Sequence, residues 1–169
     1  MKKMMIFIVF GLLTSGLLMG CGMQAAEPRD IDEDTDKCEI CSMSVMDNQF
    51  ATQLLTTEGK TYVFDDIGCM YSWMKVNPDE TDISFVRDYK TEDWIQSEDA
   101  YYVYDKNVKT PMAYNVISFE KKEDAESYIK ENEGELLDSK ELKKHEWKMN
   151  RDMMYGHEEG HSHDEEHAE

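Results

Sequence analysis

The sequence predicts an α+β fold in which two small ββα-like halves share one core. Short apolar and β-branched segments, typical of strands, alternate with segments whose apolar residues recur at helical spacing. The order strand, strand, helix occurs twice, and a shift of 55 residues aligns Phe64 with Phe119 and Asn77 with Asn132. A chain of 169 residues buries only a modest core. Its aromatic content of 11% argues against a wholly disordered chain.

The first half is predicted to contain a hairpin and a helix. Its strands span residues 49–56 and 60–64, with a Glu-Gly turn between them. Asp65 or Asp66 is expected to cap the helix, and Pro78 is expected to end it. Helical spacing places four residues of this helix on one apolar face: Ile67, Met70, Tyr71 and Met74.

The second half is predicted to contain three strands and a helix. The strands lie near residues 83–87, 100–104 and 116–119. The helix follows over about residues 121–132, and Gly134 stands where a C-terminal cap is expected.

A further helix and a tail are expected after the second half. Asp138, with Glu141 three residues later, is predicted to begin a C-terminal helix over residues 138–155. Residues 156–169 are acidic and histidine-rich, and Ala168 is their only apolar residue. This composition predicts a disordered tail.

The N-terminus has the features of a lipoprotein signal peptide. Residues 1–20 combine two early lysines with an apolar run that is too short for a comfortable membrane span. The run ends in Leu-Met-Gly-Cys at residues 18–21, which resembles the lipobox of bacterial lipoproteins. This resemblance implies cleavage before Cys21 and lipid on its thiol, so residues 21–37 become a lipidated cysteine and an acidic tether. We therefore expect a lipid-anchored protein of the cell membrane that faces outside the cytoplasm; an ordinary secretory signal is the alternative.

The charge excludes nucleic acid as a partner. The chain has 18 Lys and Arg against 37 Asp and Glu, a formal charge of −19, and removal of the two lysines of residues 1–20 would make it −21. A chain this acidic gains no affinity from neutralising phosphates.

Three cysteines remain once Cys21 is lipidated, and an odd number leaves at least one thiol unpaired. Cys38, Cys41 and Met43 lie within six residues, just before the first predicted strand. Thiolate and thioether are soft donors, and this combination favours Cu(I). Cys69, near the N-terminus of the first helix, is either a further ligand or a small buried hydrophobe.

Other roles for a C-x-x-C pair stay open. Thioredoxin-like redox pairs open a helix, whereas this pair precedes a strand. Haem attachment requires His after the second cysteine, where this chain has Ser42. A closed zinc site requires four N or S ligands, and the predicted domain offers three thiols with no nearby His. A structural disulfide between Cys38 and Cys41 is the remaining alternative.

The C-terminal tail is a separate candidate metal site. It contains four of the five histidines of the chain, interleaved with Asp and Glu. Imidazole and carboxylate suit Cu(II), Zn(II) or Ni(II), whereas a solvated tail with incidental histidines is the alternative. The candidate ligands are His157, His161, His163 and His167.

Seven segments, in order along the chain, carry a family resemblance: Cys21; Cys38-x-x-Cys41-x-Met43; residues 64–70; Asp88-Tyr89 with Trp94; residues 100–103; Thr110-Pro111-Met112; and Asp124-Ala125. Together they resemble the NosL family, the accessory copper lipoproteins of nitrous oxide reductase, over about residues 38–137. The resemblance implies an α+β fold of two ββα-like halves, related to a domain of organomercury lyase. It also implies Cu(I) binding.

The resemblance further implies which residues hold the copper. Taken alone, Met112 would be a packing residue. Ser42 and Ala113 stand where the family usually has glycine. The resemblance implies that Cys41 and Met43 are the main Cu(I) ligands and that Met112 and Cys38 complete the site.

The expected function is therefore delivery of copper by ligand exchange, without catalytic turnover. The expected client is nitrous oxide reductase or its assembly complex. One rival is a thiol–disulfide oxidoreductase lipoprotein that uses Cys38 and Cys41. A second rival is a surface metal scavenger in which the histidine tail binds the metal.

Overall fold

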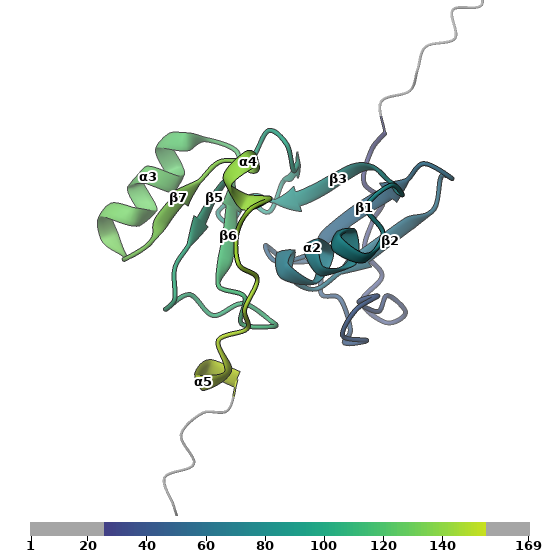
Figure 1. The fold of residues 1–169 in the computed structure, drawn as a ribbon, viewed down its shortest axis with the longest axis horizontal. Coiled ribbons are helices and arrows are strands. Elements are labelled where there is room, and N and C mark those ends of the chain that lie inside the picture. Colours follow the sequence, from purple (N-terminus) through teal and green to yellow (C-terminus); the bar gives the residue numbers. More distant parts are fainter. Residues whose placement is uncertain (1–25, 155–169) are drawn as a thin grey trace, which may run out of the picture.

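The computed structural model describes residues 26–154, which form two antiparallel sheets with helices against them (Figure 1). The first half contains β1 (Thr52–Thr56), β2 (Thr61–Phe64), α2 (Ile67–Val76), β3 (Thr81–Arg87) and β4 (Trp94–Gln96). The second half contains β5 (Tyr101–Tyr104), β6 (Val116–Phe119), α3 (Lys122–Glu131) and β7 (Glu135–Leu137). The predicted α+β class is confirmed.

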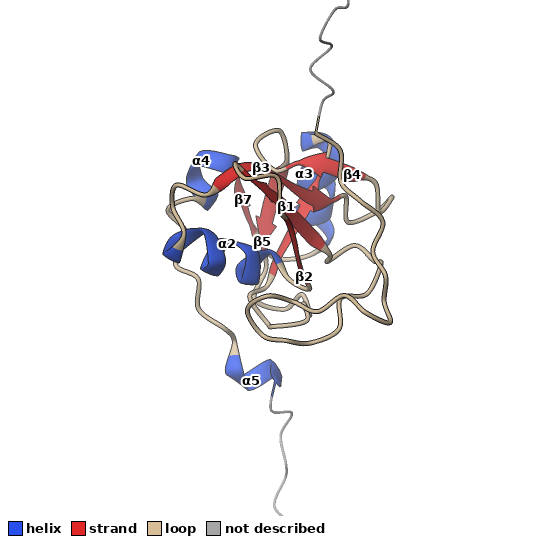
Figure 2. Cartoon of the chain, turned by 90° about the vertical axis from the view of Figure 1, so that its right-hand side faces the viewer, coloured by secondary structure: helices blue, strands red, loops and turns tan. Residues whose placement is uncertain are grey.

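Both halves contain a ββαβ unit with the same sheet order. The first sheet has the order β2-β1-β3-β4 and the second has β6-β5-β7, so the first strand of each unit lies between its other two. The starts of α2 and α3 are 55 residues apart, and so are their ends. Figure 2 shows the strands in the middle of the molecule, with α2, α3 and α4 around them. The predicted repeat is confirmed, but the strand expected near residues 83–87 of the second half is β3 of the first unit, where it pairs with β1. The corresponding strand of the second unit is β7, which pairs with β5.

Two short strands, β4 and β7, were not expected from the sequence. Three residues are too few to show the alternation that marks a strand. Pairing with β3 and with β5 makes these segments strands.

Gly134 lies two residues beyond Asn132, the actual C-cap of α3, so the expected cap at Gly134 is wrong. A Cβ at Gly134 would come within 2.8 Å of the Val103 side chain, so glycine lets β7 approach β5.

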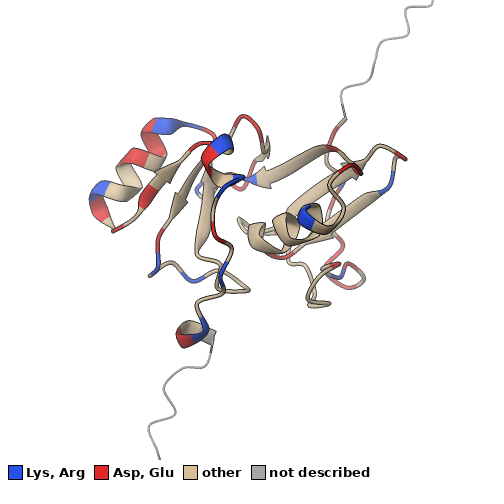
Figure 3. Cartoon of the chain, viewed as in Figure 1, with Lys and Arg blue, Asp and Glu red and all other residues tan. Residues whose placement is uncertain are grey.

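Helix α2 contacts both halves of the molecule. Asp66 caps it by accepting a hydrogen bond from Gly68 N at 2.9 Å, and Asn77 N donates to Trp73 O at its other end, just before Pro78. The helix packs against β1 and β2 and also against β6 of the second half. Six of its ten residues are buried, whereas Ala125 is the one buried residue of α3. Figure 3 shows that much of α3 consists of charged residues. The expected cap and end of α2 are confirmed.

The core joins the two halves. The main apolar cluster includes Leu54, Phe64 and Met70 of the first half with Tyr102 of the second. A smaller cluster around Val103, Ile117, Phe119 and Ala125 lies between the second sheet and α3. Successive residues of a strand point to opposite faces, so β5 contributes Tyr102 to one cluster and Val103 to the other.

The C-terminal segment differs from the expected single helix over residues 138–155. It contains two short helices, α4 (Ser139–Leu142) and α5 (Arg151–Met154), and the predicted capping box of Asp138 and Glu141 begins the first of them. Between them the chain crosses both halves: the Trp147 ring stacks on Tyr71 at 4.9 Å, and Asn150 N donates to Ala113 O at 2.7 Å. Beyond the turn that follows α4, these tertiary contacts take the place of helical hydrogen bonds over residues 146–150.

The folded part begins before Cys38, where the tether was expected to end. Arg29 and Gln53 exchange two hydrogen bonds, from Arg29 N at 3.1 Å and from Gln53 Nε2 at 2.6 Å. The Arg29 guanidinium also pairs with Asp36 at 2.6 Å, and Ile31 packs against the main cluster. Residues 29–37 therefore lie on the first half.

Several expectations concern residues outside the described range. They are the signal peptide, the lipidation site at Cys21 and the tail with His157, His161, His163 and His167. Within residues 26–154, no helix has the length and apolar character required to cross a membrane.

Candidate metal centre

Four side chains with metal-binding atoms converge next to α2. The sulfur atoms of Cys38, Cys41 and Cys69 and a carboxylate oxygen of Asp65 all lie within 4.8 Å of one another. Cys41 Sγ donates a hydrogen bond to Asp65 Oδ2 at 3.3 Å. Three segments supply these groups: the loop before β1, the turn after β2 and the first turn of α2.

The loop that carries the first two cysteines closes on itself. Cys38 N donates to Met43 O at 2.8 Å, and Ser42 N donates to Cys38 O at 2.9 Å. Glu39 N also donates to Val63 O at 3.3 Å, which ties the loop to β2. Closing the loop requires a left-handed backbone at Ser42, whose φ is 63°. The closed loop brings the C-x-x-C pair to one centre.

The two aspartates after β2 have separate roles. Asp65 joins the cysteines, whereas Asp66 Oδ2 accepts hydrogen bonds from Thr110 Oγ1 at 2.6 Å and from Met112 N at 3.0 Å. Asp66 therefore connects the cap of α2 to the loop of the second half that carries Met112. Burial raises the pKa of Asp66, and the hydrogen bonds from its partners act against this shift.

The centre is closed on one side and open at Cys41. Cys38, Cys69 and Asp65 are buried, with exposed fractions of 1%, 0% and 5%, whereas Cys41 is half-buried. All three cysteines are free thiols. Within the described residues, Asp65 Oδ1 is buried and has no hydrogen-bond partner. A ligand from solvent would therefore meet Cys41 first.

Burial and the neighbouring thiols set the protonation of the centre. The pKa of Cys38 is lowered, chiefly by a hydrogen bond with the Cys69 thiol. The pKa of Cys69 is raised, chiefly because its thiol donates this hydrogen bond to Cys38 and therefore keeps its proton. Burial raises the pKa of Cys41 to about 12 and that of Asp65 to about 6. Cys38 is thus the group that first carries negative charge.

The expected ligands lie in three different environments: a cluster of thiols, an exposed loop and the edge of the core. It brings Cys38, Cys41 and Cys69 together, so Cys69 is both buried and part of the cluster. Met43, on the closed loop, is 51% exposed. Met112 is half-buried and packs against the main cluster.

Asp65 was not identified as a site residue from the sequence, which offered it only as an alternative helix cap. A helix uses one N-cap residue, and Asp66 fills that position. The pair of adjacent aspartates was the available signal, because only one of them could cap the helix.

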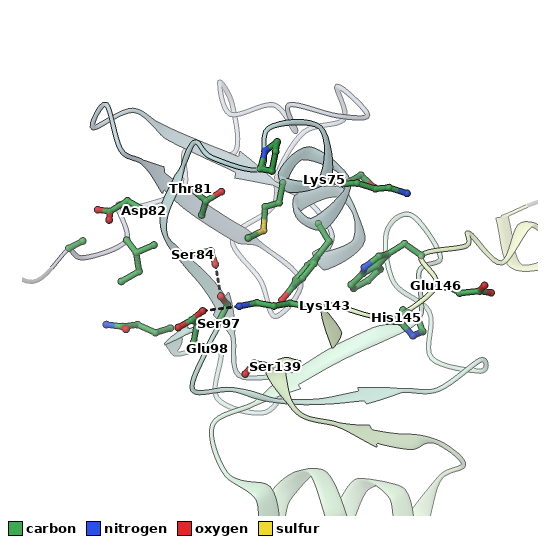
Figure 4. Close-up of a pocket in the computed structure, with 18 of the residues that line it drawn as sticks. Lys75, Thr81, Asp82, Ser84, Ser97, Glu98, Ser139, Lys143, His145 and Glu146 are labelled. Carbon is green, nitrogen blue, oxygen red and sulfur yellow. Dashed lines mark hydrogen bonds and ion pairs between the residues drawn. The ribbon is translucent and has the colours of Figure 1, made fainter. Parts of the chain in front are cut away.

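A large groove lies elsewhere on the molecule. It has a volume of about 1510 Å³ and is lined by one side of α2, by β3 and by residues 143–148, with Tyr71 and Trp147 among its walls. Figure 4 shows Lys143 pointing toward Glu98, and Ser84 hydrogen-bonded to Ser97. None of the four residues of the metal centre lines this groove, so the two sites are separate.

Comparisons with known proteins agree with this architecture. The crystal structure of the copper chaperone NosL from Shewanella denitrificans is similar, with a TM-score of 0.59 and 22% sequence identity. The match covers 66% of this chain and 92% of that one. Among curated proteins, none matches the sequence. The NosL family model matches residues 28–147, well over half of the 169 residues, and this chain therefore belongs to the NosL family.

Proposed function

We propose that this chain is a lipid-anchored protein of the cell membrane that binds Cu(I) outside the cytoplasm and delivers it to a client, without catalytic turnover. The proposed client is nitrous oxide reductase or its assembly complex. The convergence of Cys38, Cys41 and Cys69 in a NosL-family chain is the observation that carries the proposal. The similar solved structure, described as a copper chaperone, supports it.

The proposed Cu(I) ligands follow from chemistry and exposure. Soft sulfur donors select Cu(I) over hard ions. Cys41 is the thiol that an incoming partner can reach, and Met43 lies two residues further along the same closed loop. Met112 is held near the cap of α2 through Asp66, and Cys38 lies behind Cys41. Cys41 and Met43 are the main ligands, with Met112 and Cys38 completing the site.

Transfer would proceed by ligand exchange. A side chain that is half exposed can leave the metal without disturbing the core, so the Met43 thioether is the first ligand to be replaced by a sulfur of the client. Cys41, as an anionic donor, leaves last. Because Cys41 must lose its proton to bind Cu(I), and burial raises its pKa to about 12, the affinity for Cu(I) should fall as the pH falls.

The surface beside Cys41 suits contact with a client. Ile40, Met43 and Met46 are 41%, 51% and 48% exposed and lie on the same loop as Cys41. Exposed apolar groups of this kind are typical of protein contacts. A client that covers this loop would reach the metal directly.

Anaerobic Cu(I) titration against a colorimetric Cu(I) chelator tests the proposal. The protein is residues 22–169, reduced, with His157, His161, His163 and His167 replaced by Ala so that the tail cannot contribute. We expect one tightly held Cu(I) per chain and a loss of at least 100-fold in affinity in Cys41→Ser, because that change removes an anionic donor.

A matched pair of methionine variants tests the thioether ligand. Met43→Leu should weaken Cu(I) binding, whereas Met46→Leu, on the same loop and exposed to a similar extent, should leave it unchanged. Equal affinity in all variants, with a Cys38–Cys41 disulfide of defined potential, would support the redox alternative. Retention of metal only when the four tail histidines are present would support the scavenger.

Fractionation of cells tests the anchor separately. Cys21→Ser removes the thiol that would carry the lipid, so the protein should move from the membrane fraction to the soluble fraction. Membrane association that survives this change would exclude lipidation at Cys21.

A further inference from the structure

We propose that the groove between α2, β3 and residues 143–148 binds the headgroup of a zwitterionic phospholipid, which carries both a phosphate and an ammonium group. The membrane that supplies this lipid rests on the Cys21 anchor of the proposed function, whereas binding to the groove does not require the anchor. None of the residues of the metal centre lines the groove, so the inference is independent of copper.

The link between the anchor and the folded part is short. Ala26, where the described chain begins, is one of the residues that line the groove. The segment from Arg29 to Asp36 is held on the first half by Gln53 and by its own ion pair, so it does not lengthen the link. Five Cα–Cα steps join Cys21 to Ala26 and span at most roughly 18 Å. With lipid on Cys21, the groove therefore stays close to the bilayer surface.

The rim of the groove carries balanced charge, although the whole chain has a formal charge of −19. Lys143 meets Glu98 at 3.0 Å (Figure 4), Lys148 meets Glu146 at 2.6 Å, and all four side chains are more than half exposed. Exposed pairs of this kind contribute little stability, so they can separate to receive a phosphate on the lysine and an ammonium group on the carboxylate. A purely anionic headgroup would satisfy only the lysines. The charged residues of the rim are Lys75, Lys143 and Lys148 with Asp82, Glu98 and Glu146.

The walls of the groove suit the glycerol part of a phospholipid, which is partly apolar. Tyr71 is buried, and Met74, Ile83 and Trp147 are half-buried. Tryptophan and tyrosine are typical of the membrane interface, because each combines a large apolar ring with a polar N–H or O–H group. The volume of about 1510 Å³ exceeds that of most small-ligand sites and leaves room for a headgroup together with its glycerol.

The metal centre lies away from the point where the chain enters the fold. In Figure 1 the described chain starts at the upper end of the molecule, whereas the loop before β1, which carries two of the thiols, lies at the lower end. Along α2, Cys69 belongs to the first turn and the groove residue Lys75 to the last turn. A phospholipid held in the groove would therefore leave Cys41 open to a client that approaches from the aqueous side.

NMR titration with a short-chain phospholipid tests the groove directly. The protein is residues 22–169, isotope-labelled and reduced, and the probe is dihexanoyl-phosphatidylethanolamine below its critical micelle concentration. We expect saturable shifts of the backbone amides at residues 74–83 and 143–148 and of the Trp147 indole N–H. Dihexanoyl-phosphatidylglycerol should bind roughly five-fold more weakly, because its headgroup has no ammonium group for the carboxylates.

A matched pair of lysine variants tests the rim. Lys143→Gln removes one partner of the Lys143–Glu98 pair and should weaken binding of the phosphatidylethanolamine about five-fold. Lys122→Gln breaks a comparable exposed pair with Glu126 on α3, outside the groove, and should leave binding unchanged. Thermal unfolding shows that both variants are folded. The charge exchange Lys143→Glu with Glu98→Lys keeps both charges in the groove and should restore binding.

The remaining outcomes separate the groove from the anchor. No shift in the groove, shifts centred on residues 40–46, or equal binding of the two phospholipids would overturn the inference. Signals of residues 143–148 that move with protein concentration in the absence of lipid would assign the groove to a second copy of the chain, and signals that move on deletion of residues 22–25 would assign it to that segment. Groove binding in a protein whose membrane association survives Cys21→Ser would overturn only the anchor. Release from the membrane by Cys21→Ser, without groove binding of the short-chain lipid, would overturn only the groove.

Discussion

The Met112 backbone N–H donates a hydrogen bond to Asp66 Oδ2 at 3.0 Å, although 46 residues separate them in the chain. The other oxygen of Asp66 caps α2 through Gly68 N, and Thr110 Oγ1 donates to the same oxygen as Met112. One buried carboxylate thus fixes both the start of the helix that carries Cys69 and the loop that carries Met112.

Asp66→Ala should therefore lower the free energy of unfolding by about 3 kcal/mol, because it removes a cap and two further hydrogen bonds to a charged group. Urea unfolding measures this change. Asp79→Ala, an exposed aspartate beyond the end of α2, is the control and should have little effect. A loss below about 1 kcal/mol in Asp66→Ala would show that the carboxylate does not hold the two segments together.

Gly68→Ala should destabilise the protein because Tyr114 covers the Cα of Gly68. A Cβ at this position would overlap the Tyr114 ring, and both residues are buried. We expect a loss of about 2 kcal/mol, the usual effect of overpacking, despite the better helix propensity of alanine. A double-mutant cycle with Tyr114→Ala isolates the contact. If Gly68→Ala has the same effect with and without the tyrosine ring, the contact is not the cause.

Ser42→Gly and Ala113→Gly should each stabilise the protein by roughly 1 kcal/mol. Both residues have a left-handed backbone, with φ of 63° and 54°, which glycine adopts without steric strain. Ser42 directly precedes Met43, and Ala113 directly follows Met112. Thermal unfolding of each variant, compared with Ser44→Gly on the same loop, checks this: Ser44 is not among the residues of positive φ, so glycine there should destabilise.

Asp88 should contribute to the pH dependence of stability. Burial opposes its ionisation, but backbone N–H groups of Glu120, Thr91 and Lys90 donate to its carboxylate at 2.8, 2.9 and 2.8 Å and lower its pKa below the usual value. The folded state therefore binds this proton more weakly than the unfolded state does. The stability from Asp88 is present above the unfolded pKa of about 4 and is lost as the pH falls through the lower folded pKa.

Urea unfolding between pH 6 and pH 2 tests this expectation. Asp88→Asn should be less stable than the parent at pH 6 by about 2 kcal/mol, and the two proteins should converge at acidic pH. Parallel curves for the two proteins would mean that the Asp88 carboxylate does not contribute through its charge.

Local signals were sufficient for much of the fold. The apolar face of α2, the aspartate cap and Pro78 define that helix, and β6 has the predicted bounds of residues 116–119. The segment at residues 143–150 could not be predicted in the same way. Its conformation depends on stacking of Trp147 on Tyr71, a contact between residues 76 positions apart.

The metal centre was likewise predictable from the sequence only in part. The two cysteines of the loop and Cys69 could be selected as candidates from residue type and spacing alone. The convergence of Cys69 with the loop, and the part of Asp65, depend on the hydrogen bonds that close residues 38–43 against β2. Such long-range contacts leave no periodic pattern in the sequence.

The repeated ββαβ units differ most in the connection between their first two strands. Four residues join β1 to β2, whereas eleven join β5 to β6, and the longer connection carries Met112 across to the helix cap of the first half. The three thiols belong to one half and this thioether to the other. In the Cu(I) site proposed above, the relative orientation of the two halves would therefore set the spacing between Met112 and the thiols. A tilt between the halves would then open the proposed coordination sphere.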